Sequence, residues 1–200
     1  MMAPGPRVIG LTGNIATGKS EVGRMLERLG ARLIDADQVA HEVMRPGGPA
    51  YPAVVEAFGP QILANDGSVD RGKLGAIVFR DPQALRRLER AVHPATVARV
   101  DELIAAAREP VVVVEAIKLI EAGMDRGYDE LWVVTAPRRL QIRRLVERRG
   151  LSEAEAALRV DAQPPQQEKA ALADRLFVND GGLDELEKNV RQAWQEIAAG

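Results

Sequence analysis

Cysteine is absent from this chain of 200 residues, and histidine occurs only twice, as His41 and His93. Without cysteine the protein has no disulfide, no thiolate metal site and no cysteine nucleophile. Two histidines also disfavour a histidine-rich zinc site. No apolar stretch approaches the roughly 18 residues that a membrane-spanning helix needs. The run Val8–Leu11 leads directly into a glycine-rich turn, which indicates a strand and not a secretory signal. We therefore expect a cytoplasmic protein with no membrane partner.

Aromatic residues and net charge are also scarce. Aromatic side chains make up 4% of the sequence, and the formal net charge is −2. Both values disfavour nucleic acid as a partner, because such surfaces need basic residues and stacking aromatics. The apolar content of 46% and the charged content of 28% are typical of a globular protein. The length suits one core-forming domain with small insertions.

A glycine-rich phosphate-binding pattern stands near the start of the chain. Residues 13–20 read GNIATGKS and match G-x-x-x-x-G-K-S. A predicted strand precedes the pattern and a predicted helix follows it, as this motif requires. In this arrangement backbone N–H groups bind phosphates, Lys19 reaches the β- and γ-phosphates, and the Ser20 hydroxyl holds Mg²⁺. The predicted ATP-binding residues of the loop are Gly13, Asn14, Ile15, Ala16, Thr17, Gly18, Lys19, Ser20 and Glu21.

The alternation of aliphatic runs and helical patterns predicts the fold class. The runs that indicate buried strands are Val8–Leu11, Ala31–Ile34, Val111–Val114, Leu131–Thr135 and Leu176–Val178. The clearest helical patterns between and after them are Ser20–Leu29, Pro137–Arg149 and Leu183–Ile197. We predict an α/β fold of the P-loop NTPase type, with a parallel five-stranded sheet flanked by helices.

The interval between the second and third strands is too long for a single crossover and predicts a mostly helical insertion. Asp81-Pro82 indicates a helix start, Pro94 an interruption, and a further helix is expected to end near Arg108. The expected organisation is a single domain over 1–200. Its parts are a nucleotide-binding core (7–44, 111–136 and 174–198), a substrate-binding insertion (45–110) and a lid (137–165).

The predicted lid is an arginine-rich helical hairpin. Pro137 opens a helix that Gly150 ends, and Ser152–Glu155 starts a second helix with a capping box. Gln163-Pro164-Pro165 ends that second helix. Two interpretations are open: a solvated charged face with Glu147 as an internal partner, or a lid that closes arginines over transferring phosphates.

Acidic residues follow the second and third predicted strands, where ligands bind in doubly wound sheets. If the second strand neighbours the first, Asp35 and Asp37 emerge beside the γ-phosphate. One would accept the proton of an attacking hydroxyl, which predicts Asp37 as the base. The other would order Mg²⁺-bound water, which places Asp35 with Ser20 at the metal. Alternatively, one of them merely caps the next helix, Gln38–Met44.

Three further residues are candidates for the site. Glu115 follows the third strand, as a Walker B carboxylate near the metal does. His41 stands one helical turn after Asp37, where its protonated form would meet a substrate phosphate, unless it is a plain surface residue. For His93, which precedes Pro94, neutral packing or a helix-end role is the simpler interpretation.

Together these motifs resemble the dephospho-coenzyme A kinase family. The residues that carry the resemblance are Gly10–Ser20, Asp35–Asp37, Phe58-Gly59, Ile62-Leu63, Asp66–Arg71, Ile77–Phe79, Asp81-Pro82, Leu88-Glu89, His93-Pro94, Gln141, Arg144, Arg148, Gln163, Ala173-Asp174 and Asn179. They span nearly the whole chain. The phosphate loop is widely shared, whereas the Asp-Ala-Asp, Asp-Gly-Ser and His-Pro signatures together are much more specific.

The resemblance implies transfer of the γ-phosphate of ATP to the 3′-hydroxyl of dephospho-coenzyme A, with Mg²⁺, in a monomer or weak homo-oligomer. It makes the insertion the coenzyme-A-binding domain and the hairpin the lid. The implied catalytic residues are Asp37, Lys19, Arg144 and Asp35. The implied ATP contacts include Arg144, Arg148 and Asn179. The expected acceptor contacts are Thr12, Asp37, His41, His93, Glu115 and Lys118, of which Lys118 would add a phosphate contact that the family pattern does not have.

The chain departs from the family pattern in three places. After the third strand the family usually has Asp-x-Pro-Leu-Leu-x-Glu, whereas residues 115–121 read EAIKLIE, with Ile117 for proline and Lys118 for leucine. The acceptor contacts of that segment are therefore open. Glu21 stands where threonine is common, and His41 where arginine is common, so a permanent charge becomes a titratable one.

Three other functions compete with this one. Another small-molecule kinase of the same architecture would act on a nucleoside or nucleotide. A switch GTPase should carry an Asn-Lys-x-Asp segment, which this chain lacks, and a regulatory ATPase would need no acceptor. A nucleic-acid surface on the arginine-rich helix conflicts with the acidic charge balance.

Overall fold

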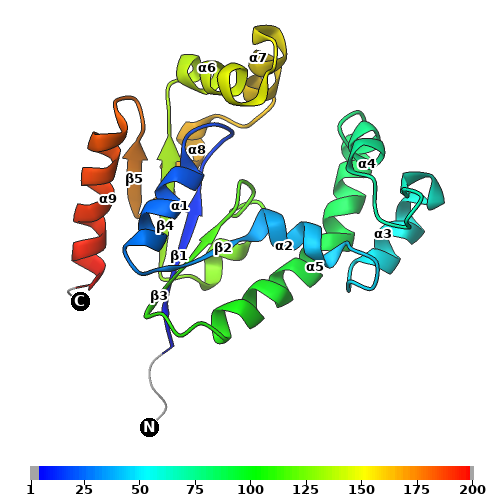
Figure 1. The fold of residues 1–200 in the computed structure, drawn as a ribbon, viewed down its shortest axis with the longest axis horizontal. Helices are drawn as coiled ribbons and strands as arrows, with labels where there is room; N and C mark the ends of the chain where they lie inside the picture. The colour runs from blue at the N-terminus through cyan, green and yellow to red at the C-terminus, as the bar shows by residue number, and fades with distance from the viewer. Residues whose placement is uncertain (1–4, 199–200) are drawn as a thin grey trace. The chain divides into compact units, whose positions relative to one another are not determined.

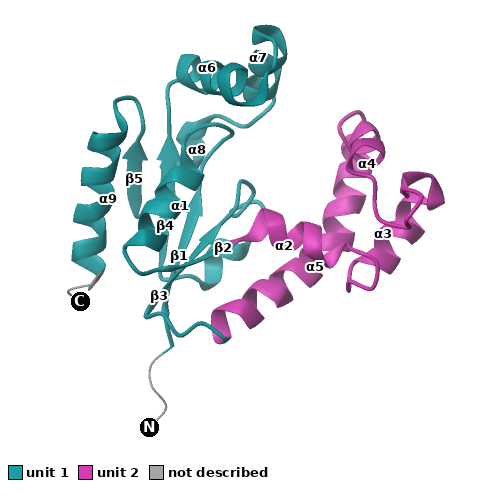
Figure 2. Cartoon of the chain, in the orientation of Figure 1, with its two compact units in different colours: residues 1–34, 106–200 teal, residues 35–105 magenta. Residues whose placement is uncertain are grey.

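The computed structural model describes residues 5–198. Its elements in chain order are β1 (Arg7–Thr12), α1 (Lys19–Arg28), β2 (Arg32–Asp35), α2 (Ala36–Val43), α3 (Tyr51–Phe58), η1 (Pro60–Ile62), α4 (Arg71–Val78), α5 (Pro82–Ala105), β3 (Val111–Glu115), η2 (Met124–Gly127), β4 (Glu130–Thr135), α6 (Arg138–Arg149), α7 (Glu153–Asp161), α8 (Gln166–Ala170), β5 (Arg175–Val178) and α9 (Leu183–Ala198). Every predicted strand is confirmed to within one residue at each end. The structure divides into two units, residues 1–34 with 106–200 and residues 35–105 (Figure 2).

The strands form one five-stranded sheet in the order β2-β3-β1-β4-β5 (Figure 1). β1 pairs in parallel with β3 on one side and with β4 on the other. The predicted α/β class is thus confirmed. The condition set for the two aspartates is not met: β2 does not neighbour β1, because β3 lies between them. The acid that the topology brings beside the phosphate loop is therefore Glu115, at the end of β3.

The core of the first unit forms between the sheet and the helices α1 and α9. Aliphatic side chains of β1 and β3 pack there against α1, and Val190 and Ile197 of α9 complete the cluster. Trp132 is fully buried, and its ring centre lies 5.4 Å from that of Phe177 on the neighbouring strand β5. The amphipathic spacing of α1 and α9 is the reason that both helices bury one face here. The core fixes the carboxyl ends of the strands, on which the loops of the site begin.

In the hairpin of α6 and α7, the first helix ends and the second begins where the sequence predicts. Gly150 follows α6 with φ 64°, a left-handed value that glycine adopts without strain. The Ser152 side chain accepts from the Glu155 N–H, and the Glu155 carboxylate accepts from the Ser152 N–H, which completes a capping box. Arg138 donates to both carboxylate oxygens of Asp161 and links the two helices. The short helix α8 after the hairpin was not predicted.

The second unit consists of helices α2 to α5. The expected break at Pro94 is wrong, since α5 runs as one helix from Pro82 to Ala105 with Pro94 inside it. Burial of Val92 and Val100 on one face of α5 explains the continuity, because packing compensates for the hydrogen bond that proline removes. No helix among residues 5–198 is long and apolar enough to cross a membrane.

Candidate functional site

The phosphate loop, residues 13–20, is curled by contacts within itself and with Asn179, the residue directly after β5. The Thr17 hydroxyl donates to the Asn14 carbonyl at 3.0 Å. Gly18 has φ 100°, and a Cβ atom there would collide with the side-chain amide of Asn179. Glycine is therefore required at this position both for its backbone and for the close approach. α1 begins directly after Gly18, and its first N–H groups have no acceptor within the helix, which makes them available to phosphate oxygens.

A buried ion pair joins the loop to β3. Lys19 Nζ lies 2.6 Å from Glu115 Oε1, and the side chains are 8% and 4% exposed. The Ser20 hydroxyl donates to the same oxygen at 2.5 Å. One carboxylate thus binds the two loop residues that are expected to bind phosphate and Mg²⁺. A direct contact between Glu115 and an acceptor stays a prediction.

Arg144 and Asn179 fix the carbonyl side of the loop. The Arg144 guanidinium donates to the carbonyls of Ala16 and Thr17, both at 3.1 Å, and to Asn179 Oδ1 at 3.0 Å. The Asn179 amide donates to the Thr17 carbonyl at 2.8 Å. Burial, and secondarily the positive charge of neighbouring arginines such as Arg148, lowers the pKa of Arg144 from its ordinary value. A partly desolvated cation of this kind interacts strongly with an incoming anion.

A cavity of about 240 Å³ opens over the loop. Besides the loop itself, its lining includes Ile117 and the cations Lys19, Arg24, Arg144, Arg148 and Arg149. The lid contacts the loop directly, because a small apolar cluster of α6 and α7 packs against Ile15 and Ala16. Both the cationic lining and the loop N–H groups fit a triphosphate. The hairpin is thus in contact with the loop on one side, while Arg143 and Glu147 form an ion pair at 3.7 Å on its exposed surface; that it acts as a lid stays a prediction.

The two aspartates after β2 differ in their surroundings. Asp35 is the N-cap of α2, and its carboxylate accepts from the Gln38 N–H at 3.0 Å. The capping alternative is thus realised for Asp35. Asp37 lies in the first turn of α2, one turn before His41. Among residues 5–198, no group of three or more His, Cys, Asp or Glu side chains is arranged to hold a metal ion. A Mg²⁺ ion bound by Ser20 would therefore take most of its ligands from phosphates and water.

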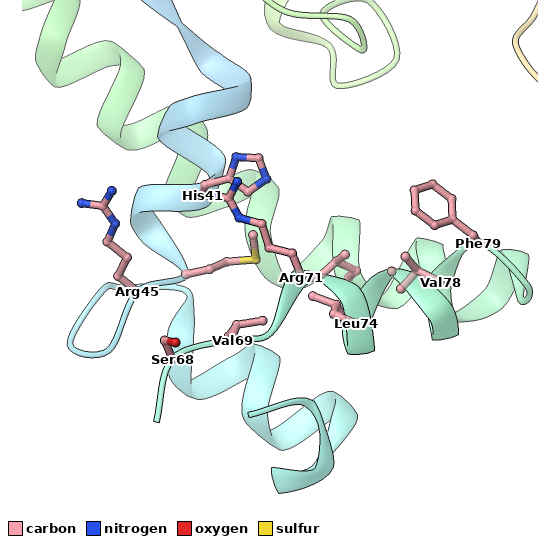
Figure 3. Close-up of a pocket in the computed structure, with 11 residues that line it drawn as sticks. His41, Arg45, Ser68, Val69, Arg71, Leu74, Val78 and Phe79 are labelled. Atoms are coloured by element: carbon pink, nitrogen blue, oxygen red, sulfur yellow. The ribbon is translucent and has the colours of Figure 1, made fainter. Parts of the chain in front are cut away.

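The second unit contains a larger cavity of about 510 Å³ (Figure 3). Its floor is apolar, with Val69, Leu74 and Val78, while the exposed Phe79 stands at its edge, and its rim carries His41, Arg45 and Arg71. The Arg71 side chain reaches toward His41, while Phe79 lies at the opposite end from Arg45 (Figure 3). Burial and then the Arg71 charge lower the pKa of His41, while Asp37 and Asp35 act in the opposite direction. A cationic rim over an apolar floor suits a ligand with both phosphate and uncharged parts.

The remaining predicted residues lie in both units. The Thr12 hydroxyl is buried and donates to the Ile117 carbonyl at 3.2 Å. Lys118, in the same segment, is exposed. His93 is half-buried on α5 in the second unit.

Sequence reasoning missed several residues that the structure brings to these sites. Gln163 was expected only at a helix end and in the family pattern, yet its side chain accepts from the Ile15 N–H at 2.6 Å. Arg45 and Arg71 line the second cavity. Arg71 is the last residue of the Asp-Gly-Ser-Val-Asp-Arg motif. A cation at the end of such a motif could have indicated a residue of the site. Lys169 in α8 offered no signal, because nothing in its sequence neighbourhood distinguishes it from a surface lysine.

Known proteins resemble this chain over nearly its full length. A model of the family described as dephospho-CoA kinase matches residues 7–185. The dephospho-CoA kinase of Geobacter sulfurreducens is 47% identical over 190 residues, which cover 94% of this chain and 96% of that protein. The crystal structure of TT1252 from Thermus thermophilus superposes with a TM-score of 0.83 at 32% identity and covers 96% of this chain and 98% of that one. For dephospho-CoA kinase from Campylobacter jejuni the TM-score is 0.70 at 27% identity, with the same coverage.

Proposed function

Because this chain belongs to the dephospho-CoA kinase family, we propose that it transfers the γ-phosphate of ATP to the 3′-hydroxyl of dephospho-coenzyme A. The structural observation that carries the proposal is the buried set of Lys19, Ser20 and Glu115 at the phosphate loop. A kinase needs charge neutralisation and positioning at the donor, and this set supplies both. The alternative of a nucleoside or nucleotide kinase is not favoured by the family assignment.

The donor is bound in the first unit. The loop N–H groups hold the β- and γ-phosphates, and Lys19 neutralises the charge that develops during transfer. Arg144 and Arg148 face the same cavity from the lid and add positive charge. Mg²⁺, when bound, would supply further positive charge that makes the terminal phosphate more electrophilic. Ser20 is the loop residue that would hold it.

The acceptor is bound in the second unit. The apolar floor of its cavity suits the pantetheine arm, and the cations Arg45 and Arg71, with His41 beside them, suit the diphosphate of dephospho-coenzyme A. Asp37 accepts the proton of the 3′-hydroxyl as that oxygen attacks the γ-phosphate. Asp35 holds the first turn of α2, which carries Asp37, and assists at the metal through water. Thr12, His93, Glu115 and Lys118 remain proposed acceptor contacts.

The decisive experiment is an ADP-release assay with purified protein and Mg-ATP. Dephospho-coenzyme A is compared with AMP, uridine and shikimate as acceptors, and the product is identified by mass spectrometry. The proposal expects equal amounts of ADP and coenzyme A, the 3′-phosphorylated form of the acceptor. ADP release with AMP or uridine alone would make the protein a nucleotide or nucleoside kinase. ADP release without any acceptor would make it an ATPase. The cytoplasmic location, the Mg²⁺ requirement and the monomeric or weakly oligomeric state stay predictions.

A further inference from the structure

A buried lysine in α8 contacts the segment that follows β3. Lys169 is only 5% exposed, although it lies on a helix of five residues. Its ammonium donates to the Ile117 carbonyl and forms an ion pair with Glu121 Oε1 at 3.1 Å. The Thr12 hydroxyl donates to the same carbonyl. Ile117 is therefore fixed by two donors, from α8 and from the end of β1.

Burying a lysine at this position is energetically unfavourable. Removing an ammonium from water is unfavourable, and an apolar side chain of similar length would pack without that penalty. The ion pair offsets only part of the penalty, because the Glu121 side chain is 41% exposed and screened by water. The other contact that an apolar residue could not make is the bond to the Ile117 carbonyl, which holds backbone and not a half-exposed side chain. What the lysine provides is thus the position of that backbone.

The fixed backbone lies two residues after Glu115. Glu115 is the last residue of β3 and binds Lys19 and Ser20 of the phosphate loop. Ala116 donates to the Leu11 carbonyl at 3.1 Å, so the strand pairing ends there and Ile117 is the next point of attachment. A backbone that is free to shift beyond this point would let the Glu115 carboxylate shift as well. Misplacement by about 1 Å at a reacting centre costs up to about a hundredfold in rate.

The same stretch of chain holds two other loops of the site. The Gln163 side chain accepts from the Ile15 N–H, and the Pro164 carbonyl accepts from the Asn14 amide at 2.9 Å. The Gln166 amide accepts from the Ala136 N–H and donates to its carbonyl, each at 3.0 Å. Residues 163–169 thus contact the loops after β1, β3 and β4. Lys169 is the member of this stretch that fixes the β3 loop.

We propose that Lys169 is a positioning residue for phosphoryl transfer, which acts through the Ile117 carbonyl to hold Glu115 against Lys19 and Ser20. The inference rests on the proposed function. It predicts that the effect of Lys169 on kcat depends on an intact Glu115. The effect of Lys169 on stability should not depend on Glu115.

The test is a double-mutant cycle of Lys169→Met and Glu115→Gln, measured by kcat for coenzyme A formation. Each kcat is divided by the fraction of protein that binds ADP in calorimetry, and the Tm is recorded separately. We expect Lys169→Met to lower kcat on the order of tenfold or more, with the ADP Kd changed by less than about threefold. In the Glu115→Gln background the same change should lower kcat by less than about twofold, because the group being positioned is already altered. The drop in Tm should be similar in both backgrounds.

Lys169→Arg, which keeps a buried donor, should recover part of the lost rate. Lys188→Met removes an exposed lysine of α9 and is the matched control, with unchanged kcat. An unchanged kcat per binding-competent site in Lys169→Met, or equal fold losses in both backgrounds, would reduce Lys169 to a structural residue and overturn the inference.

If Lys169→Met does not fold, Lys169→Leu replaces it in the cycle, because it also removes the donor to the Ile117 carbonyl but fills the buried space with a different apolar shape. A loss of kcat that again disappears in Glu115→Gln supports the inference, and a wild-type kcat in Lys169→Leu contradicts it. An assay of the wild-type protein in parallel tells a failure of the proposed function from a failure of the inference about Lys169. If it forms no coenzyme A, the proposed function fails, and the cycle is then read on the acceptor that wild type does phosphorylate.

Discussion

Arg144 and Asn179 bind the same backbone oxygen, the carbonyl of Thr17, from two different elements. They also bind each other, since the Arg144 guanidinium donates to Asn179 Oδ1. The phosphate loop is therefore connected to the lid helix α6 and to the end of β5 through one atom. A loop held in this way does not need to be ordered by the nucleotide, which lowers the entropic cost of binding.

Replacing Arg144 and Asn179 should show that the two act as a unit. Arg144→Gln and Asn179→Ala should each raise the KM for ATP, because each loosens the Thr17 carbonyl. Their effects on the binding free energy of ADP should be coupled by about 0.5–3 kcal/mol. Calorimetric titration of ADP into both single variants and the double variant measures the coupling. Simple additivity would show that the shared oxygen does not connect them.

Lys19→Ala should have two separate consequences. The rate should fall by orders of magnitude, because a charge directed at the transferring phosphate is lost. The free energy of unfolding should fall as well, by about 3 kcal/mol, because Glu115 is left buried without its cation. The double variant Lys19→Met with Glu115→Gln should regain much of this stability and none of the activity. Urea unfolding and the ADP-release assay measure the two effects, and a double variant no more stable than Lys19→Ala would contradict the account.

Asp37→Asn tests the proposed base. The substitution keeps the shape of the side chain and should leave ADP binding unchanged, while kcat falls by about 10²–10⁴. Single-turnover kinetics at saturating ATP and acceptor give the rate of the chemical step. An unaltered rate would assign the base elsewhere, with Asp35 the next candidate.

The His41 imidazole should make stability depend on pH in a defined window. Its pKa is lowered below 6.5 in the folded state, chiefly by burial, so the unfolded chain binds the proton first. The free energy of unfolding therefore falls as the pH drops from about 6.5 toward the folded-state pKa, and changes no further below it. His41→Gln should lack this component. The difference in Tm between wild type and variant, measured from pH 5 to 8, isolates it from the titration of other groups. A constant difference would reject the assignment.

Gly18 and Gly47 provide a matched test of the loop. Both have a left-handed φ, of 100° and 83°, but a Cβ would meet Asn179 at Gly18 and nothing within 4 Å at Gly47. Gly47→Ala should cost about 1 kcal/mol of stability, from backbone strain alone. Gly18→Ala should cost more and should also weaken ADP binding, because the Asn179 amide must move. Equal losses of stability and unchanged ADP binding would show that the contact is unimportant.

The strands and the phosphate loop could be predicted because their signals are local. A short aliphatic run or a G-x-x-x-x-G-K-S pattern needs no information from distant residues. Strand order was less accessible, so the placement of β3 between β1 and β2 was missed, and with it the pairing of Glu115 with Lys19. Pro94 was misjudged because a helix-breaking propensity of this size is overcome by packing along α5. Lys169 could not be recognised, since its importance depends on a carbonyl 52 positions away in the chain.

The packing of Ile15 and Ala16 against the small core of the lid limits what the loop can tolerate. The G-x-x-x-x-G-K-S pattern leaves these two positions open to any amino acid, but in this protein they also form part of the surface on which a helical hairpin rests. Exchanging the loop for that of another nucleotide-binding protein would keep every phosphate ligand and still remove the apolar surface on which the hairpin packs. Grafting experiments on this scaffold therefore need to move the loop and the hairpin together.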